Sequence, residues 1–318
     1  MLKKNIYKDL LFGVAIGDAL GVPVEFQPRE SVRLNPVTGM RFFDMHKLPS
    51  GTFSDDSSMT FCLAEALTHE FNLTTIGDNF VQWLNNGFWT AHGKAFDVGG
   101  ATWRAIDRLS AGCDPGQAGG ISASDNGNGS LMRILPLLGY IKDKPVDERY
   151  QVTKQVSSIT HAHIRSVIAC FYYLEFARKI ITGMDKFEIY KDLCVEIPAF
   201  LESLSINEEE IKPFDRILNG NVQELPEEQI QSSGYVIHTL EASIWCLLTT
   251  NNYENAVLKA VNLGEDADTT GAVTGGLAGL LYGFDSIPKN WVEEIARRDD
   301  IMDLAERCDH KLTGDNLL

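Results

Sequence analysis

Two carboxylates and a hydroxyl stand close together in the acidic turn Gly264–Thr270. Asp266 and Asp268 are two residues apart, and Thr269 follows them directly. On a continuous helix, side chains two residues apart diverge, whereas in a turn both carboxylates can face one cation. The spacing therefore favours a metal site made of oxygen ligands at this turn.

A second acidic turn, Ser54–Ser57, precedes an apolar segment that begins at Met59. Ser and Asp are common at helix starts, where their side chains accept hydrogen bonds from free backbone amides, so each turn is also explained as a helix N-cap. Together, however, the two turns supply four carboxylates and two hydroxyls. Because Mg²⁺ and Mn²⁺ prefer oxygen ligands, the pair of turns indicates a divalent cation site.

Two glycine-rich turns, Asp97–Thr102 and Gly127–Ser130, could hold an anion. Glycine lets backbone amides approach an anion closely, although Asn-Gly pairs are also typical of ordinary turns. His161 stands shortly before a long apolar segment. A histidine in that place is more often a helix cap or a core residue than a ligand contact.

Glu25 lies on a segment that we expect to be irregular, because Gly21 and Pro23 end the first helix just before it. A glutamate in such a segment is usually only solvated. Beside a metal centre it becomes a candidate acid or base.

The charge of the chain restricts its partners. The formal net charge is −16, from 44 acidic and 28 basic residues. A phosphate-rich partner is repelled by such a surface, so non-specific nucleic-acid binding is not expected. If the ligand is a nucleotide, then metals, backbone amides or helix N-termini must hold its phosphates.

The six cysteines form no Cys-x-x-Cys pair and no zinc-finger spacing, so reduced core thiols are expected. No segment offers about 18 uninterrupted apolar residues, which is the length that a membrane span needs. We therefore expect a protein without a membrane segment, cytoplasmic and monomeric.

Helical periodicity dominates the chain, because apolar residues recur at spacings of three and four. The segments with this pattern are Ile6–Leu20, Met59–Phe71, Ile76–Leu84, Val167–Ile181, Val236–Leu248, Ala256–Leu263, Thr270–Leu281 and Trp291–Ala296. The alternation typical of strands is nearly absent, and only Val32–Phe53 has a character that fits a small hairpin. The pattern predicts an all-α fold, and the length fits one domain, residues 1–318.

Three longer stretches interrupt the helices: Pro36–Asp56, Ala111–Gly129 and Asn219–Gly234. Loops of this length are uncommon inside a compact domain unless they line a site. The first two are therefore predicted to be active-site loops.

In combination, the motifs resemble those of the ADP-ribosylglycohydrolase family over most of the chain. The matching motifs are Gly17–Gly21 with Glu25, Ser54–Asp56 with Met59, Asp97 with Gly99 and Thr102, Gly127–Arg133, Thr160-His161, Gly234–Val236 and Gly264–Thr270. Their order along the chain agrees with the family, so the joint pattern is more specific than any one motif. The resemblance implies a single-domain orthogonal helical bundle with a central dinuclear site for two divalent cations, Mg²⁺ or Mn²⁺.

The resemblance also implies roles for individual residues. The implied metal ligands are Ser54, Asp55, Asp56, Asp266, Asp268 and Thr269. The implied substrate contacts are Gly99, Thr102, Gly127, Asn128, Gly129, Ser130, His161 and Tyr235, the last two near the adenosine end. Glu25, Asp97 and Asp55 are the candidate catalytic residues, and the sequence leaves open which carboxylate is the base.

The chain departs from the family pattern at a few positions. The family usually has Thr at positions 54 and 57, where this chain has Ser, and the hydroxyl is kept. It usually has Gly at position 265, where Glu265 adds a negative charge beside the implied metals. The family also has a Pro a few residues after the histidine that corresponds to His161, and that Pro is missing here.

The implied activity is metal-dependent hydrolysis that removes ADP-ribose from a modified acceptor by cleaving the bond at the anomeric carbon of the distal ribose. A metal-dependent nucleotide pyrophosphohydrolase is one alternative, because paired aspartates and two metals serve that reaction as well. A non-catalytic ADP-ribose-binding or structural protein is another, and its expected mark is loss of the metal ligands. The acceptor, whether a protein side chain, a nucleic-acid end or a small molecule, is not specified by the sequence.

Overall fold

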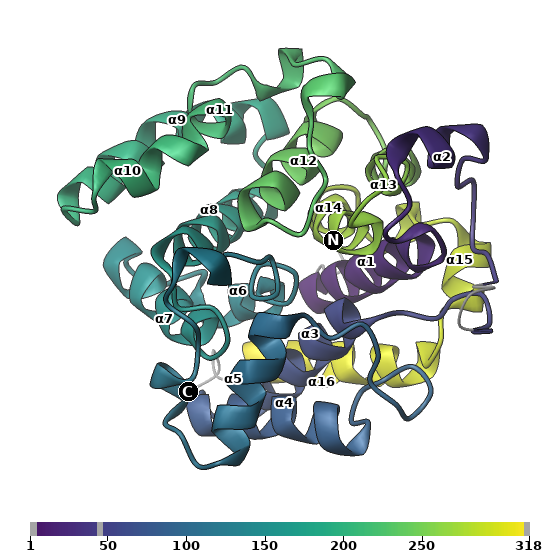
Figure 1. The fold of residues 1–318 in the computed structure, drawn as a ribbon, viewed down its shortest axis with the longest axis horizontal. Coiled ribbons are helices and arrows are strands. Elements are labelled where there is room, and N and C mark those ends of the chain that lie inside the picture. The colour runs from purple at the N-terminus through teal and green to yellow at the C-terminus, as the bar shows by residue number, and fades with distance from the viewer. Residues whose placement is uncertain (1–4, 43–46, 315–318) are drawn as a thin grey trace.

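The computed structural model describes residues 5–42 and 47–314. These residues form helices joined by irregular segments (Figure 1). The α-helices are α1 (Ile6–Gly21), α2 (Arg29–Leu34), α3 (Asp55–Leu67), α4 (Leu73–Asn86), α5 (Gly100–Ser110), α6 (Leu138–Ile141), α7 (Val146–Ser158), α8 (Ile164–Ile181), α9 (Lys186–Ser203), α10 (Glu208–Ile211), α11 (Asp215–Leu218), α12 (Val236–Leu248), α13 (Tyr253–Val261), α14 (Ala267–Tyr282), α15 (Lys289–Glu294) and α16 (Arg298–Gly314). The all-α prediction is confirmed, and no strand occurs among the described residues.

The hairpin expected over Val32–Phe53 is not formed by the described part of that stretch. Its first residues belong to α2, and residues 35–42 and 47–53 form neither a helix nor a strand. Of residues 35–42 only Val37 is fully buried, so this segment has no continuous apolar face that a strand could bury. Residues 43–46 lie outside the described residues.

Several helices lack a clear apolar periodicity in the sequence and were not predicted, among them α5, α7, α9 and α16. Charged and polar residues make up much of α16, and Pro198 stands inside α9. Both features weaken a sequence pattern that relies on apolar periodicity and on the absence of proline. These helices form because one face of each packs against the rest of the fold.

Helices α1 and α14 lie side by side near the middle of the fold (Figure 1). Glycines at four-residue spacing line the contact on both helices: Gly13 and Gly17 on α1, and Gly271 and Gly275 on α14. A Cβ atom on Gly17 would collide with the carbonyl oxygen of Gly271, and one on Gly13 with that of Gly275. The two backbones are therefore closer than any larger residue would allow.

The same close contact extends to the ends of the two helices. A Cβ atom on Gly21, the last residue of α1, would collide with the backbone of Asp268 at the start of α14. The C-terminal turn of α1 thus abuts the N-terminal turn of α14. This brings Asp18 of α1 next to the acidic turn that opens α14.

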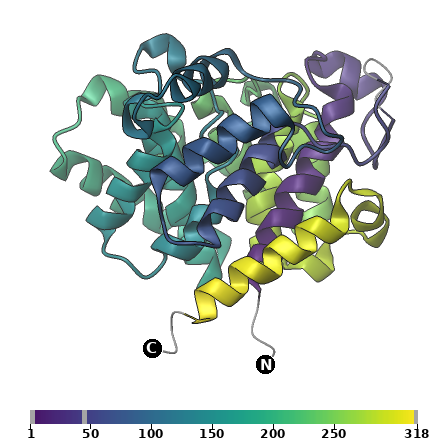
Figure 2. The ribbon, with the colours of Figure 1, turned by 90° about the horizontal axis from the view of Figure 1, so that it is seen from below.

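The other helices enclose this central pair. Helices α12 and α13 pack against α14, whereas α3 and α16 pack against α1. Figure 2 shows α16 crossing below α1 and α3. No helix in the described part of the chain combines the length and apolar character that a membrane crossing requires.

We predict that Gly17→Ala lowers the free energy of unfolding by about 1–3 kcal/mol, the usual cost of overpacking a core. Alanine favours a helix over glycine by up to about 1 kcal/mol, so a net loss would show that the close helix contact outweighs helix propensity. Chemical denaturation monitored by circular dichroism measures the change.

Gly77→Ala on α4 is the matched control, because a Cβ atom there would meet its nearest neighbour, Leu109, at 3.5 Å, an ordinary contact. This variant should be as stable as the parent or slightly more stable. Equal stability of both variants would show that α1 and α14 can separate without cost.

Candidate functional site

Asp18, in the last turn of α1, holds the start of α3. The backbone amide of Ser54 donates hydrogen bonds to both carboxylate oxygens of Asp18, at 2.9 and 3.1 Å. The amide and the hydroxyl of Ser57 donate to Oδ2 of Asp18, at 2.9 and 2.5 Å. Burial raises the pKa of Asp18 to about 6, although these hydrogen bonds oppose the rise.

The first turn of α3 carries the acidic residues that the sequence singled out. Ser54 is the N-cap, and its Oγ accepts a hydrogen bond from the amide of Asp56 and donates one to Oδ2 of Asp56, at 3.0 Å. Asp55 and Asp56 are both buried, at 6% and 1% exposure. The N-cap interpretation of this turn is thus confirmed, yet it does not account for two buried carboxylates.

The start of α14 faces this turn. Asp266 is the N-cap residue of α14, and Oδ2 of Asp266 accepts a hydrogen bond of 2.6 Å from the side-chain amide of Asn128. Thr269 donates from Oγ1 to Oδ2 of Asp56 at 3.3 Å, which links the two acidic turns. Asp268 lies one residue before Thr269 and is 1% exposed.

The carboxylates form two groups that could each hold a cation. Oxygens of Asp18, Asp56 and Asp268 lie within 4.8 Å of one another, and so do oxygens of Glu25, Asp97 and Asp268. Oδ1 of Asp56 and Oδ2 of Asp268 are buried and have no hydrogen-bond partner among the described residues. A buried carboxylate oxygen without a partner is unfavourable unless a cation or a proton compensates its charge.

Burial is the main cause of raised pKa values in this cluster. It raises the pKa of Asp55, Asp56 and Asp268 well above the usual range, and repulsion by neighbouring carboxylates adds to the rise. The donor set is made only of oxygen atoms, which fits a hard divalent cation such as Mg²⁺ or Mn²⁺. The residues present therefore fit a metal site.

A cavity of about 750 Å³ opens above the acidic cluster. The sequence-predicted residues that line it are Glu25, Asp55, Asp97, Gly99, Thr102, Gly127, Asn128, Gly129, His161, Asp266 and Thr269. Ser54, Asp56 and Asp268 are buried in the acidic cluster and are not on the cavity wall.

Ser130 and Tyr235, two of the predicted substrate contacts, do not line the cavity. Ser130 is fully buried, and its hydroxyl accepts a hydrogen bond of 3.0 Å from Ser157. The hydroxyl of Tyr235 accepts a hydrogen bond from Arg165, and its ring packs edge-on against His238. The structure therefore places the side chains of Ser130 and Tyr235 in other contacts.

Glu25 and Asp97 face each other at the edge of the acidic cluster. One carboxylate oxygen of each lies within 4.8 Å of the other, and both lie equally close to an oxygen of Asp268. Burial, followed by repulsion from Asp268, raises the pKa of Glu25 far above its usual range. A carboxyl group that keeps a proton at neutral pH can act as a general acid or base.

Two backbone hydrogen bonds tie the segment around Glu25 to the acidic turn of α14. The amide of Phe26 donates to the carbonyl of Glu265 at 2.6 Å, and the amide of Glu265 donates to the carbonyl of Gln27 at 2.7 Å. Phe26 and Glu265 have φ values of 60° and 57°, in the left-handed region that favours glycine. Both side chains are exposed and line the cavity.

The comparisons with known proteins agree with this arrangement. The model of the ADP-ribosylglycohydrolase family matches residues 3–316. The chain belongs to this family. A solved structure described as an ADP-ribosylglycohydrolase-related protein complex superposes with a TM-score of 0.80 at 29% identity, covering 98% of this chain and 100% of the other.

Individual members of the ADP-ribosylglycohydrolase family are similar over most of the chain. An ADP-ribosylarginine hydrolase of Pseudomonas putida is 34% identical over 94% of this chain and 76% of its own length. One of Serratia proteamaculans is 32% identical over 94% of this chain and 78% of its own length. An ADP-ribosyl-[dinitrogen reductase] glycohydrolase of Rhodospirillum rubrum is 28% identical over 89% of this chain and 87% of its own length.

Asp18 is the residue of the cluster that sequence reasoning did not assign to the site. It lies within a buried apolar helix, where an aspartate is rare unless it is paired. That unusual position, inside the motif Gly17–Gly21, was the signal that could have identified it.

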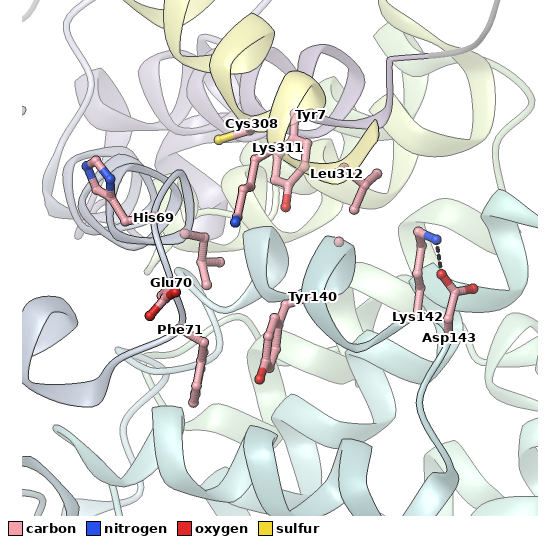
Figure 3. Close-up of a pocket in the computed structure, with 12 residues that line it drawn as sticks. Tyr7, His69, Glu70, Phe71, Tyr140, Lys142, Asp143, Cys308, Lys311 and Leu312 are labelled. Atoms are coloured by element: carbon pink, nitrogen blue, oxygen red, sulfur yellow. Dashed lines mark hydrogen bonds and ion pairs between the residues drawn. The ribbon is translucent and has the colours of Figure 1, made fainter. Parts of the chain in front are cut away.

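A second cavity, of about 530 Å³, lies beside α6 and α16 (Figure 3). Its walls include Tyr7, Tyr140 and Lys142, and the ring of Tyr140 stacks on Phe71 with 4.5 Å between centroids. None of the sequence-predicted site residues lines it. The chemistry expected from the sequence therefore belongs to the larger cavity.

We predict that the metal-free protein becomes less stable as pH rises. The pKa of Asp18 is about 6 in the folded protein against an ordinary value of 3.8, so the folded state binds more protons than the unfolded state between these values. Stability from this group is present below about pH 4 and is lost as pH rises through about 6. Asp55, Asp56 and Asp268, whose pKa values are also raised, extend the loss to higher pH.

A cation replaces the missing protons, so Mg²⁺ should raise the midpoint of thermal unfolding more at about pH 7.5 than at about pH 5. Differential scanning fluorimetry at both pH values measures this, with NaCl at matched ionic strength as the control. An equal effect of Mg²⁺ at both pH values would contradict a cation bound by these carboxylates.

Proposed function

We propose that this protein hydrolyses the bond between ADP-ribose and a modified arginine, with two divalent cations held by the acidic cluster. The proposal depends on two buried carboxylate oxygens, one on Asp56 and one on Asp268, that have no hydrogen-bond partner in the described part of the chain. They lie below a cavity large enough for a nucleotide sugar. Membership of the ADP-ribosylglycohydrolase family supports the reaction class.

The residues that would hold the cations are those of the two acidic turns, Ser54, Asp55, Asp56, Asp266, Asp268 and Thr269, together with Asp18. When bound, two such cations supply Lewis-acid stabilisation to the hydroxyl groups of the distal ribose and to the attacking water. The protein's own contribution is to hold the bond between ADP-ribose and the acceptor beside Glu25 and Asp97. A proton on Glu25 can pass to the leaving group, and the carboxylate that remains can take a proton from the attacking water.

The glycine turn Gly127–Ser130 would receive the pyrophosphate. Its glycines leave the backbone accessible from the cavity, and the side chain of Asn128 is fixed by its hydrogen bonds to Asp266 and Thr239. Backbone amides and bound cations would then attract the phosphates, although the protein as a whole carries a formal charge of −16.

Two features support arginine as the acceptor. The relatives from Pseudomonas putida and Serratia proteamaculans are ADP-ribosylarginine hydrolases. In addition, the carboxylate of Glu265 and the ring of Phe26, which is 74% exposed, stand on the wall of the cavity next to Glu25. A carboxylate and an aromatic ring together suit a planar guanidinium, through hydrogen bonds and cation–π contact.

The acceptor and the reaction can be tested with defined substrates. We expect release of free ADP-ribose from ADP-ribosylarginine in the presence of Mg²⁺ or Mn²⁺, at least tenfold faster in kcat/KM than from ADP-ribosylserine, and no turnover in excess chelator. Chromatography of the products distinguishes the alternatives. AMP as the product would establish a pyrophosphohydrolase instead, and binding without turnover would establish a non-catalytic protein.

Glu265→Gln should lower kcat/KM for ADP-ribosylarginine roughly fivefold, because an ionic hydrogen bond to the guanidinium is lost. The affinity for free ADP-ribose should not change. Glu254→Gln removes one charge from an exposed position on α13 and is the matched control. An equal loss with ADP-ribosylserine would argue against acceptor recognition by Glu265.

Glu25→Gln should lower kcat by at least a hundredfold, since its carboxyl group handles a proton in the transition state. ADP-ribose affinity and metal content should stay within a few-fold of the parent, and calorimetry and metal analysis on one sample measure both. The carboxylate of Glu25 also lies within reach of Asp97 and Asp268 in one of the two cation groups. Loss of metal from the variant would therefore identify Glu25 as a ligand.

A further inference from the structure

A buried arginine stands directly behind the glycine turn of the cavity. Arg133 is 0% exposed and has no carboxylate partner among the described residues. Its Nη2 donates to the carbonyl of Val156 at 3.2 Å and to Oγ1 of Thr160 at 2.7 Å. The guanidinium lies over the ring of Phe80, 4.6 Å from its centroid. A buried cation without an anion nearby calls for an explanation.

The hydroxyl of Thr160 stands between Arg133 and His161. Arginine can only donate hydrogen bonds, so Oγ1 of Thr160 accepts from Arg133. The other partner of this hydroxyl is Nδ1 of His161, at 2.9 Å. Thr160 is fully buried, and among the described residues its hydroxyl hydrogen has no acceptor other than Nδ1. Since a buried O–H group without an acceptor is unfavourable, Thr160 donates to Nδ1.

His161 is neutral in this environment. Burial, followed by the charge of Arg133, lowers the pKa of His161 to about 3. Arg104 acts in the same direction and Asp125 against it. A neutral imidazole that accepts at Nδ1 carries its hydrogen on Nε2.

Nε2 of His161 lies next to the glycine turn. A Cβ atom on Gly127 would stand 3.5 Å from Nε2, and one on Gly129 would stand 2.7 Å from Cε1 and 3.3 Å from Nε2. His161 lines the cavity, and Nε2 has no hydrogen-bond partner among the described residues. The glycines therefore leave room for this edge of the ring, where a hydrogen-bond donor is presented to a ligand.

We infer that Arg133 and Thr160 are positioning residues that fix His161 as a neutral Nε2–H donor to an acceptor oxygen of ADP-ribose. The identity of the ligand rests on the proposed function, whereas the tautomer does not. We call this chain of hydrogen bonds, from Arg133 through Thr160 to His161, the relay. It would give an acidic protein a hydrogen-bond donor of fixed orientation for an anionic ligand, and it would add no charged side chain to the cavity wall.

The tautomer can be measured in the unliganded protein by long-range ¹H–¹⁵N correlation of labelled histidine. The chain has seven histidines, and the spectrum of His161→Gln assigns the signals of His161 by their absence. We expect a protonated Nε2 and an unprotonated Nδ1, unchanged between about pH 5 and about pH 8. A protonated Nδ1, or titration within this range, would overturn the inference.

Variants of the two positioning residues test the relay. Thr160→Val removes the hydroxyl and should give a mixture of tautomers, with the dissociation constant for ADP-ribose in Mg²⁺ raised roughly fivefold. Thr160→Ser keeps the hydroxyl and should retain both the tautomer and the affinity within about twofold. Arg133→Met frees the oxygen of Thr160 to accept from Nδ1, so the Nδ1–H form should appear. Circular dichroism confirms that each variant is folded.

Each result decides one part of the inference. If folded Thr160→Val keeps both the parental tautomer and the parental affinity, the relay is wrong. If the parent shows the expected tautomer but binds no ADP-ribose, the proposed function and the ligand role of His161 fall together, while the relay itself stands.

Discussion

The structure depends on the burial of several carboxylates in one small volume. Water cannot solvate Asp56 and Asp268 there, and each charge repels the others. The fold responds by placing these carboxylates at the first turns of α3 and α14, where the positive ends of two helix dipoles meet. Hydrogen bonds between described residues satisfy only part of the oxygens, so a proton or a cation must compensate the remaining charge.

The glycine contact between α1 and α14 makes this arrangement possible. Two helices with ordinary side chains pack with axes roughly 8–10 Å apart, and a larger residue at Gly17 or Gly271 would hold these two further apart. Asp18, which accepts four hydrogen bonds from the start of α3, would then lie further from Asp268 at the start of α14. A segment without catalytic chemistry of its own therefore determines whether the acidic turns meet.

The sequence predicted those helices and turns that depend on a local pattern of apolar and polar residues. The bounds of α12 coincide with the predicted Val236–Leu248, because that segment is apolar and ends in polar residues. It did not predict α16, because charged residues interrupt the apolar pattern of the one face that is buried. It also did not place Asp18 in the cluster, because that position follows from the packing of α1 against α14, which is far away in the sequence. The hydrogen bonds that Ser130 and Tyr235, two predicted substrate contacts, make to Ser157 and Arg165 depend on tertiary packing and could not be predicted either.

Backbone hydrogen bonds at Phe26 and Glu265 join the segment that contains Glu25 to the acidic turn that opens α14. Glu25 and Asp266 each lie one residue from this junction, so a short local connection sets the distance between their carboxylates. Both junction residues hold left-handed backbone conformations. A substitution that changes the backbone at Phe26 or Glu265 would therefore move Glu25 and Asp266 together, whereas one that changes only the exposed side chain would leave both carboxylates in place.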